Sequence, residues 1–415
     1  MNASTLTATY RIVTPMFCSG ADQKKAELRL ASFKGALRFW WRSLMWNELS
    51  NEREPHKVLR ERESELFGSS DQNQGQSKIR LRLGNEKEDK LAKPFDAGQV
   101  FEHGELSGAH YLGYGVMEAF HSKPKNTMAG QLTRPMIPSG QFTVHIRFAS
   151  SLLQSQRNEV KNALILLGTL GGLGSKSRKG FGSLSLTRLV DRDTEIELVA
   201  SSTDRLKKLL PTASDRLPEW TAWSGQSRLV TAFGPEGISP NQLLNLLGRE
   251  QIFFRSWGSK GRVLGEEREG NFKSDHDLSQ GMKVDVNYPA RTSFGLPHSY
   301  GKGPAKEVAP NSFDRRASPV FIHIHQLTDA SPPNAFIAFL PSRFLPDGEQ
   351  INVFGQRISQ PDYPDFWYPI NGFLDRLTSD GNRPKHRSGY DKFPAGSQWW
   401  KKKTKLTGTE VQLGS

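Results

Sequence analysis

Alternating apolar and polar positions predict the strands in the first half of the chain. Over residues 6–12 every second residue is apolar, which is the pattern of a strand with one buried face. The same alternation recurs over residues 79–83 and 142–148, and a further strand runs through Leu184 and Leu186. These segments predict a sheet with one face against a core.

Two segments between these strands carry the wider spacing of amphipathic helices. Over residues 32–49, apolar side chains recur every three or four residues, and Ser32 is placed to cap the helix N-terminus. Residues 156–170 show a similar apolar stripe. The order strand, helix, two or three strands, helix, strand is that of a ferredoxin-like domain.

The second half of the chain predicts another domain of the same kind. A charged segment with two prolines, residues 191–225, is interpreted as a linker. Beyond it, strands are predicted over residues 228–234, 319–327 and 335–341, with a helix over residues 240–257.

These elements predict an α+β protein of two ferredoxin-like (RRM-like) domains packed together. A chain of 415 residues has the length of two domains. We expect an N-terminal domain at 1–190, a linker at 191–225, a C-terminal domain at 226–395 and a basic flexible tail at 396–415.

Charge narrows the class of partner. The chain has 56 basic and 43 acidic residues, so its formal net charge is +13. Such an excess favours a polyanion, with nucleic acid ahead of an anionic membrane. No apolar run is long enough to span a membrane, and the N-terminus lacks the order of a signal peptide, so we expect a cytoplasmic protein. The single Cys18 excludes a disulfide framework and a cysteine-based zinc site, and no metal or cofactor is predicted.

The predicted helix over residues 32–49 carries a row of cations. Lys34, Arg38 and Arg42 are spaced four residues apart and share one face, and no acidic residue lies between Leu28 and Asn47. A phosphate backbone would supply the missing negative charge. Trp41 flanks the row and is predicted to stack on a base. The alternative is a row whose cations pair with acids elsewhere in the fold.

A glycine-rich loop is the second candidate for RNA binding. Six glycines fall between Gly168 and Gly182, interleaved with cations. Neither the P-loop spacing nor a dinucleotide fingerprint is present, and the later aromatics of an RRM signature are missing. We therefore expect the loop to hold RNA backbone, with a structural glycine turn as the alternative. Its predicted RNA-contacting residues are Gly171, Gly172, Gly174, Ser175, Lys176, Arg178 and Lys179.

Several segments together resemble the RAMP superfamily of CRISPR proteins. Their combination is most similar to the family of first subunits of the Cmr (type III-B) effector complex. The segments that carry the resemblance are residues 14–22, 34–42, 65–68, 171–184, 295–297 and 316–320. The resemblance implies two ferredoxin-like domains and a non-catalytic, RNA-contacting role in antiviral defence. It also implies three partners: guide RNA near its 3′ portion, target single-stranded RNA, and other Cmr subunits.

Two other functions stay open from the sequence. A stand-alone RAMP endoribonuclease would need a general base, yet none of the ten histidines lies in the basic helix or the glycine loop. The pair His323 and His325, or the Asp275–Asp277 segment, offers metal-ligand types, although a structural role is favoured for both. The third possibility is a purely structural assembly subunit. We predict no catalytic residue.

Overall fold

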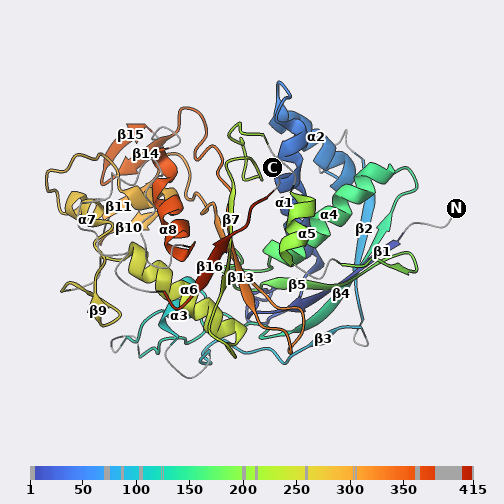
Figure 1. Ribbon diagram of the computed structural model, residues 1–415, viewed down its shortest axis with the longest axis horizontal. Coiled ribbons are helices and arrows are strands. Elements are labelled where there is room, and N and C mark those ends of the chain that lie inside the picture. Colours follow the sequence, from blue (N-terminus) through green and yellow to red (C-terminus); the bar gives the residue numbers. More distant parts are fainter. Residues whose placement is uncertain are drawn as a thin grey trace.

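Two ferredoxin-like domains make up most of the computed structural model (Figure 1). The first domain lies on the right of that view and the second on the left. The structure describes residues 5–69, 75–85, 88–101, 106–122, 124, 126–198, 202–210, 214–257, 260–301, 303, 306–359, 365–378 and 404–413.

The N-terminal domain has the predicted ferredoxin-like topology. Its main strands lie in the order β2-β4-β1-β5 and every pair is antiparallel. Short strands β3 and β6 extend this sheet. In chain order its elements are β1 (Thr5–Ile12), α1 (Leu30–Leu49), α2 (Pro55–Phe67), β2 (Ile79–Leu83), β3 (Lys90–Leu91), α3 (Ser107–Leu112), β4 (Gly140–Phe148), α4 (Gln154–Leu170), β5 (Leu184–Asp191) and β6 (Thr194–Glu195).

Burial of one sheet face under α1 and α4 forms the core of this domain. The ring of Tyr10 lies 5.5 Å from Phe33 of α1 and 5.6 Å from Phe142 of β4. Its hydroxyl donates to the carbonyl of Leu164 on α4, so the one polar atom of this buried side chain is satisfied. Helix α1 begins at Leu30, ahead of the cap predicted at Ser32, and Arg29 in the cap position makes no side-chain cap bond.

The C-terminal domain repeats the same strand order, β12-β13-β7-β16. Its insertions add a second small sheet, β10-β11-β14-β15, and the hairpin β8-β9. After α5 (Ser202–Leu209), its elements are β7 (Arg228–Phe233), α6 (Pro240–Arg255), β8 (Arg262–Val263), β9 (Glu266–Glu267), α7 (Lys273–Ser279), η1 (Ala290–Phe294), β10 (His298–Ser299), β11 (Glu307–Pro310), β12 (Val320–His325), β13 (Asn334–Phe339), β14 (Gln350–Val353), β15 (Gln356–Ser359), η3 (Asp365–Trp367), α8 (Tyr368–Thr378) and β16 (Thr407–Glu410).

Two segments predicted as irregular are part of the fold. Strand β16 belongs to the predicted flexible tail, yet it pairs with β7. Its Glu410 forms an ion pair with Arg228 of β7, with 2.7 Å between the two side chains. The predicted linker contains α5, whose Leu206 is fully buried in the first core. Residues 381–403, which include the first part of the predicted tail, lie outside the described residues.

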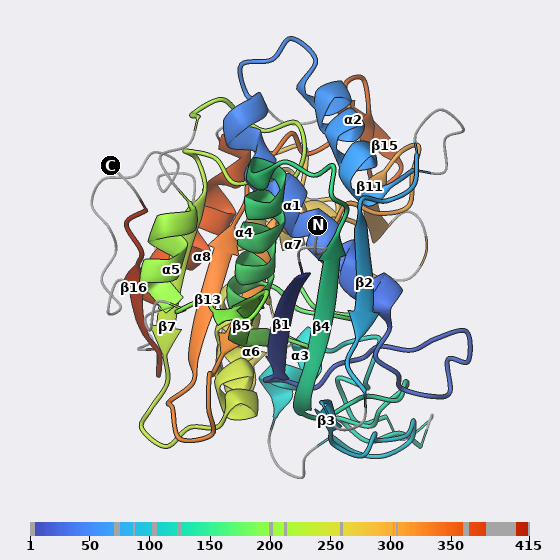
Figure 2. The same cartoon turned by 90° about the vertical axis from the view of Figure 1, so that its right-hand side faces the viewer.

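The two sheets meet where edge strand β12 lies against the glycine-rich loop and β5. Figure 2 shows the strands of the second sheet beside those of the first. The backbone N–H of Ile322 donates to the carbonyl of Arg178 at 3.0 Å. The next two outward N–H groups, of Ile324 and Gln326, donate to the hydroxyls of Ser183 and Ser185, each at 3.1 Å. A loop carbonyl and two serine hydroxyls thus accept the hydrogen bonds that the carbonyls of a neighbouring strand would otherwise accept.

Replacing Ser183 and Ser185 by alanine should weaken this junction. Two buried N–H donors would lose their acceptors, which costs about 1–3 kcal/mol each. Chemical denaturation should report a lower free energy of unfolding, and the exposed pair Ser151→Ala and Ser155→Ala is the matched control. Equal stability of the two double variants would show that the serines do not hold the sheets together.

Candidate RNA interface

The basic row of α1 faces α2, and two of its three cations share one carboxylate there. Arg38 Nε and Arg42 Nη1 both donate to Oε1 of Glu63 at 2.6 Å. The Glu63 side chain is only 9% exposed, so this carboxylate is held inside the fold. For Arg38 and Arg42, the interpretation in which the cations of the row pair with an acid elsewhere in the fold is confirmed. The two guanidiniums share a single carboxylate, so the row keeps a net positive charge, and its contact with RNA stays a prediction.

Lys34 at the start of the row has an internal partner as well. Its Nζ donates to the carbonyl of Phe67 at 2.8 Å, where α2 ends and leaves carbonyls unpaired. Burial, and then the charge of Arg38, lower the pKa of Lys34. The lysine ammonium acts here as a C-terminal cap for α2.

Trp41 is not available to stack on a base. It is 1% exposed, and its ring lies 5.7 Å from that of Phe67. Its Nε1–H donates to Glu159 at 2.9 Å, and burial raises the pKa of that carboxyl. The stacking prediction for Trp41 is therefore wrong, because the apolar stripe of α1 is wide enough to include it.

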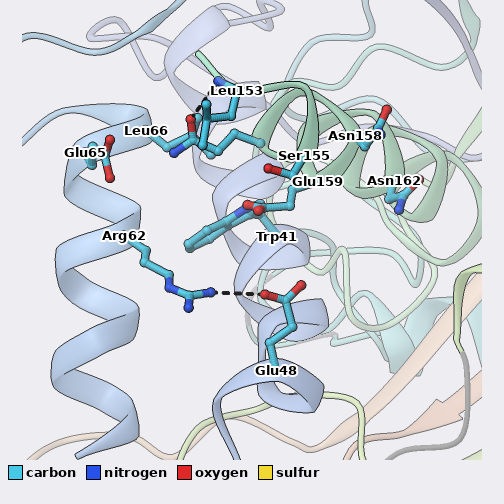
Figure 3. A pocket seen from close by; sticks show the side chains of 11 residues that line it. Trp41, Glu48, Arg62, Glu65, Leu66, Leu153, Ser155, Asn158, Glu159 and Asn162 are labelled. Atoms are coloured by element: carbon cyan, nitrogen blue, oxygen red, sulfur yellow. Dashed lines mark hydrogen bonds and ion pairs between the residues drawn. The ribbon is translucent and has the colours of Figure 1, made fainter. Parts of the chain in front are cut away.

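A cavity of about 570 Å³ opens beside Trp41, between α1, α2 and α4 (Figure 3). Glu48 on its wall pairs with Arg62 at 3.0 Å, and Glu65 and Glu159 add further carboxylates. The lining thus holds more negative than positive charge. Glu65 is in turn paired with Lys78 at 2.6 Å, and burial raises the pKa of Glu159, so the excess of negative charge in this cavity is small.

The glycines of the loop are required by the protein's own backbone. Gly174 has a left-handed φ of +84°, and a Cβ there would lie 2.4 Å from the carbonyl oxygen of Phe17. Ser175 N–H donates to that same oxygen at 2.9 Å. A Cβ on Gly172 would lie 2.7 Å from the carbonyl of Gly182, and His323 donates to the carbonyl of Gly171 at 2.8 Å. The interpretation of the loop as a structural turn accounts for these glycines. The N–H of Ser175 cannot serve in the predicted backbone site for phosphate, because it already donates to Phe17.

Arg178 is fixed in the junction between the domains. Its guanidinium lies 5.2 Å from the ring centre of Phe39 on α1 and 4.6 Å from that of Phe321 on β12. It donates to the carbonyl of Ser318 at 2.8 Å. Burial, and then the charge of Arg316, lower the pKa of Arg178 to about 10. This arginine joins the domains and also lines the cavity beside the loop.

A cavity of about 350 Å³ separates the loop from the first half of α1. Its wall combines the apolar side chains of α1 with loop backbone and one guanidinium. The lining residues are Ser32, Ala36, Phe39, Trp40, Leu170, Gly171, Gly172, Leu173, Gly174, Ser177, Arg178 and Phe321. The position of Trp40 in the core, predicted from the sequence, is confirmed.

Lys176 and Lys179 differ from all the other predicted cations. Within the described part of the chain, neither ammonium has a hydrogen-bond or ion-pair partner. Burial is the main cause that lowers the pKa of Lys179 to about 7, and three neighbouring cations, Arg255, Lys176 and Arg178, lower it further. Burial and the charge of Arg315 lower the pKa of Lys176. Burial and neighbouring cations cause both shifts, and no ion pair to either ammonium is found among the described residues.

The candidate metal ligands have structural partners instead. His323 and His325 are 1% and 2% exposed, and burial lowers the pKa of His323 to about 3, so its ring is neutral. Asp275 accepts from the backbone N–H groups of Ala290 and Arg291. Among the residues that the structure describes, no group of three or more metal-ligating side chains comes together.

Comparison with known proteins agrees with this architecture. Residues 9–185 match the family model described as RAMP superfamily. The matched segment contains α1 and the glycine-rich loop.

Two proteins of Pyrococcus furiosus are similar to this chain over different lengths. "CRISPR system Cmr subunit Cmr1-2" is 27% identical over 183 residues, which are 43% of this chain and 92% of that protein. The crystal structure of Cmr1 in its apo form matches with a TM-score of 0.52 and 17% identity, over 99% of both chains. The second match shows that both ferredoxin-like domains follow a known fold.

A chain in the cryo-EM structure of the Type III-B Cmr-beta bound to cognate target RNA matches with a TM-score of 0.44. It is 11% identical over 82% of this chain and 94% of that chain, which is too distant to support an inference. No helix in the described residues is both long and apolar enough to cross a membrane.

The sequence analysis did not identify the charged residues that interact with the predicted cations. Glu63 lies on α2, which was not predicted, although Pro55 at its start and the apolar pair Leu66 and Phe67 at its end mark a helix. Arg255 and Arg315 come from the second domain, and no local pattern links them to the loop.

Replacing Glu63 by glutamine should destabilise the protein, because Arg38 and Arg42 would lose the negative charge that they share. Two charge-assisted bonds would be lost, which is worth about 1.5–3 kcal/mol in the free energy of unfolding. The control is Glu61→Gln on the exposed face of the same helix. If both variants unfold at the same denaturant concentration, Glu63 is not the counter-charge of the row.

Proposed function

We propose that this chain is a non-catalytic RNA-binding subunit of a type III-B CRISPR (Cmr) ribonucleoprotein. In this proposal it contacts guide RNA near its 3′ portion and target RNA, and it serves antiviral defence beside other Cmr subunits. The observation that carries the proposal is the pair Lys176 and Lys179, whose charges no described group neutralises, on the loop of a RAMP domain. The name of the Cmr1-2 relative supports the assignment to a Cmr complex.

A phosphate backbone is the ligand that this loop suits best. Phosphate oxygens accept charge-assisted hydrogen bonds from ammonium groups and favour their protonated form. The aromatic rings of Phe39 and Phe321 beside the loop already contact the guanidinium of Arg178. Binding through backbone charge predicts weak sequence preference and strong salt dependence.

A non-catalytic role is favoured over the endoribonuclease. No histidine lines the cavity beside the loop. His298 is the histidine whose pKa the charge of Lys179 affects, and burial and neighbouring cations lower that pKa to about 3. A base this weak is a poor proton acceptor near neutral pH.

The direct test is RNA binding by the double variant Lys176→Gln and Lys179→Gln. Affinity for a labelled single-stranded RNA should fall by on the order of tenfold at low salt, and the log–log salt slope should shrink by about 0.7 for each lost contact. The matched control is Lys24→Gln with Lys25→Gln, an exposed pair in the same domain. Unchanged affinity in the well-folded loop variant would contradict the proposal.

Two further readouts separate the alternatives. Gly172→Val with Gly174→Val should lower the melting temperature, because both glycines approach backbone too closely for a side chain. The labelled RNA should stay intact during all these titrations, and cleavage by the purified chain would favour the endoribonuclease. An absence of salt-dependent RNA binding would favour the purely structural subunit.

A further inference from the structure

The face of the first sheet opposite α1 and α4 carries two arginines directly beside each other. Strands β2 and β4 are neighbours (Figure 2), and Arg80 and Arg147 are cross-strand partners in their antiparallel register. Both residues are exposed. We propose that this cross-strand arginine pair is a second RNA contact, in which the two guanidiniums bind a backbone phosphate. The inference rests on the proposed function and adds a surface outside the glycine-rich loop.

The alternation of the two strands turns both arginines away from the core. On β4, the neighbours of Arg147 in sequence, Ile146 and Phe148, are buried in the core under α1 and α4, so Arg147 points to the opposite face. The burial pattern of β2 places Arg80 on that same face. Cross-strand partners have their Cβ atoms about 5 Å apart, so both side chains can reach one phosphate.

Other cations on this face of the sheet have partners inside the protein. Arg11 of β1 forms an ion pair with Asp329. Arg188 of β5 forms an ion pair with Glu195 at 3.2 Å. These two positive charges are therefore compensated before any ligand binds.

The next cross-strand pair along β2 and β4, Arg82 and His145, has internal partners as well. Nη1 of Arg82 donates to the carbonyl of Leu83 at 3.3 Å. His145 contacts Glu88 through Nε2 and Thr7 through Nδ1. The acidic side chain beside this pair makes it a poorer site for an anion than the pair formed by the other two arginines.

The side chains of Arg80 and Arg147 have no hydrogen-bond or ion-pair partner in the part of the chain that the structure describes. Like charges at directly opposed positions destabilise a sheet. Protection of an edge strand against pairing accounts for a charge on β2, but β4 lies between β2 and β1 and needs none. A bound anion removes the repulsion between the two guanidiniums, which gives the pair a function.

The chemistry of this surface favours RNA over an acidic protein. Two guanidiniums present planar donors that match the oxygens of a phosphate. Exposed Thr5 lies opposite Arg147 on β1 and adds a hydroxyl, a group that commonly contacts nucleic-acid backbone. Among the described residues, none of the exposed large apolar side chains lies on β1, β2 or β4. A protein interface would need an apolar centre there.

The pair and the glycine-rich loop lie at opposite ends of β1. Thr5 at one end is the partner of Arg147, and Ile12 at the other end pairs with Leu184, where the loop ends. At about 3.4 Å per residue, β1 separates the two sites by roughly 20 Å. One RNA strand of several nucleotides can therefore contact both.

The first test compares RNA binding of two double variants that lose the same charge. Arg80→Gln with Arg147→Gln removes the pair, and Arg53→Gln with Arg357→Gln removes two exposed arginines elsewhere. We expect the affinity for a labelled single-stranded RNA to fall on the order of tenfold at low salt in the pair variant and to change little in the control. Equal affinities of the two variants would overturn the proposal.

The second test uses the repulsion within the pair. Arg80→Glu places a carboxylate opposite Arg147 and turns the repulsion into an attraction. We expect a higher melting temperature and weaker RNA binding in this one variant, whereas a purely structural role would lower the melting temperature. Arg357→Glu is the matched control and should change neither measurement appreciably. Native RNA affinity in the folded Arg80→Glu variant would overturn the proposal.

The outcomes separate this inference from the proposed function. If the loop lysine variant loses affinity and the arginine-pair variant equals its control, the second contact is wrong and the proposed function stands. If both variants keep full affinity, both proposals fail. Native RNA affinity together with lost association with the other Cmr subunits would assign the pair to an acidic protein surface and overturn the RNA assignment.

Discussion

The unpaired edge of β12 in the protein interior is the constraint on which the junction depends. Its outward N–H groups must find acceptors, because a buried donor without one is costly. The carbonyl of Arg178 and the hydroxyls of Ser183 and Ser185 meet them at every second residue. The close approaches of Gly172 to Gly182 and of Gly174 to Phe17 hold the same loop to the first domain. The loop backbone is therefore in contact with both domains.

The predicted cations fall into two groups, those with a partner inside the protein and those without one. Arg38 and Arg42 pair with Glu63, and Lys34 donates to the carbonyl at the end of α2. Arg178 donates to the carbonyl of Ser318 across the junction between the domains. Lys176 and Lys179 find no such partner among the described residues. In a basic protein, a cation therefore indicates an RNA-binding site only when its partners inside the protein are known. Lys179 lies on the part of the loop that pairs with Ile322 of β12.

The sequence was a good guide where a periodic pattern spans a whole element. Strands β1, β2 and β4 and helices α1 and α4 were predicted from alternation and stripes, and so was the ferredoxin-like order. Strand β16 was not predicted, because Thr407–Glu410 contains no apolar residue. Only its pairing with β7 makes this segment a strand. The role of Trp41 was misassigned, and the partner of the basic row was missed, for a related reason. Helical spacing shows which residues share a face, but it does not show that α2 covers that face with Glu63.

The central claim is that the charged form of Lys179 has no counter-charge among the described residues and is stabilised by a bound anion. Its pKa lies below the ordinary value, so the unfolded chain binds the proton more tightly and the charge destabilises the fold near neutral pH. The decisive measurement is the melting temperature of Lys179→Met together with its affinity for single-stranded RNA. The account predicts a higher melting temperature and weaker RNA binding in the same variant. A lower melting temperature with unchanged RNA affinity would contradict it.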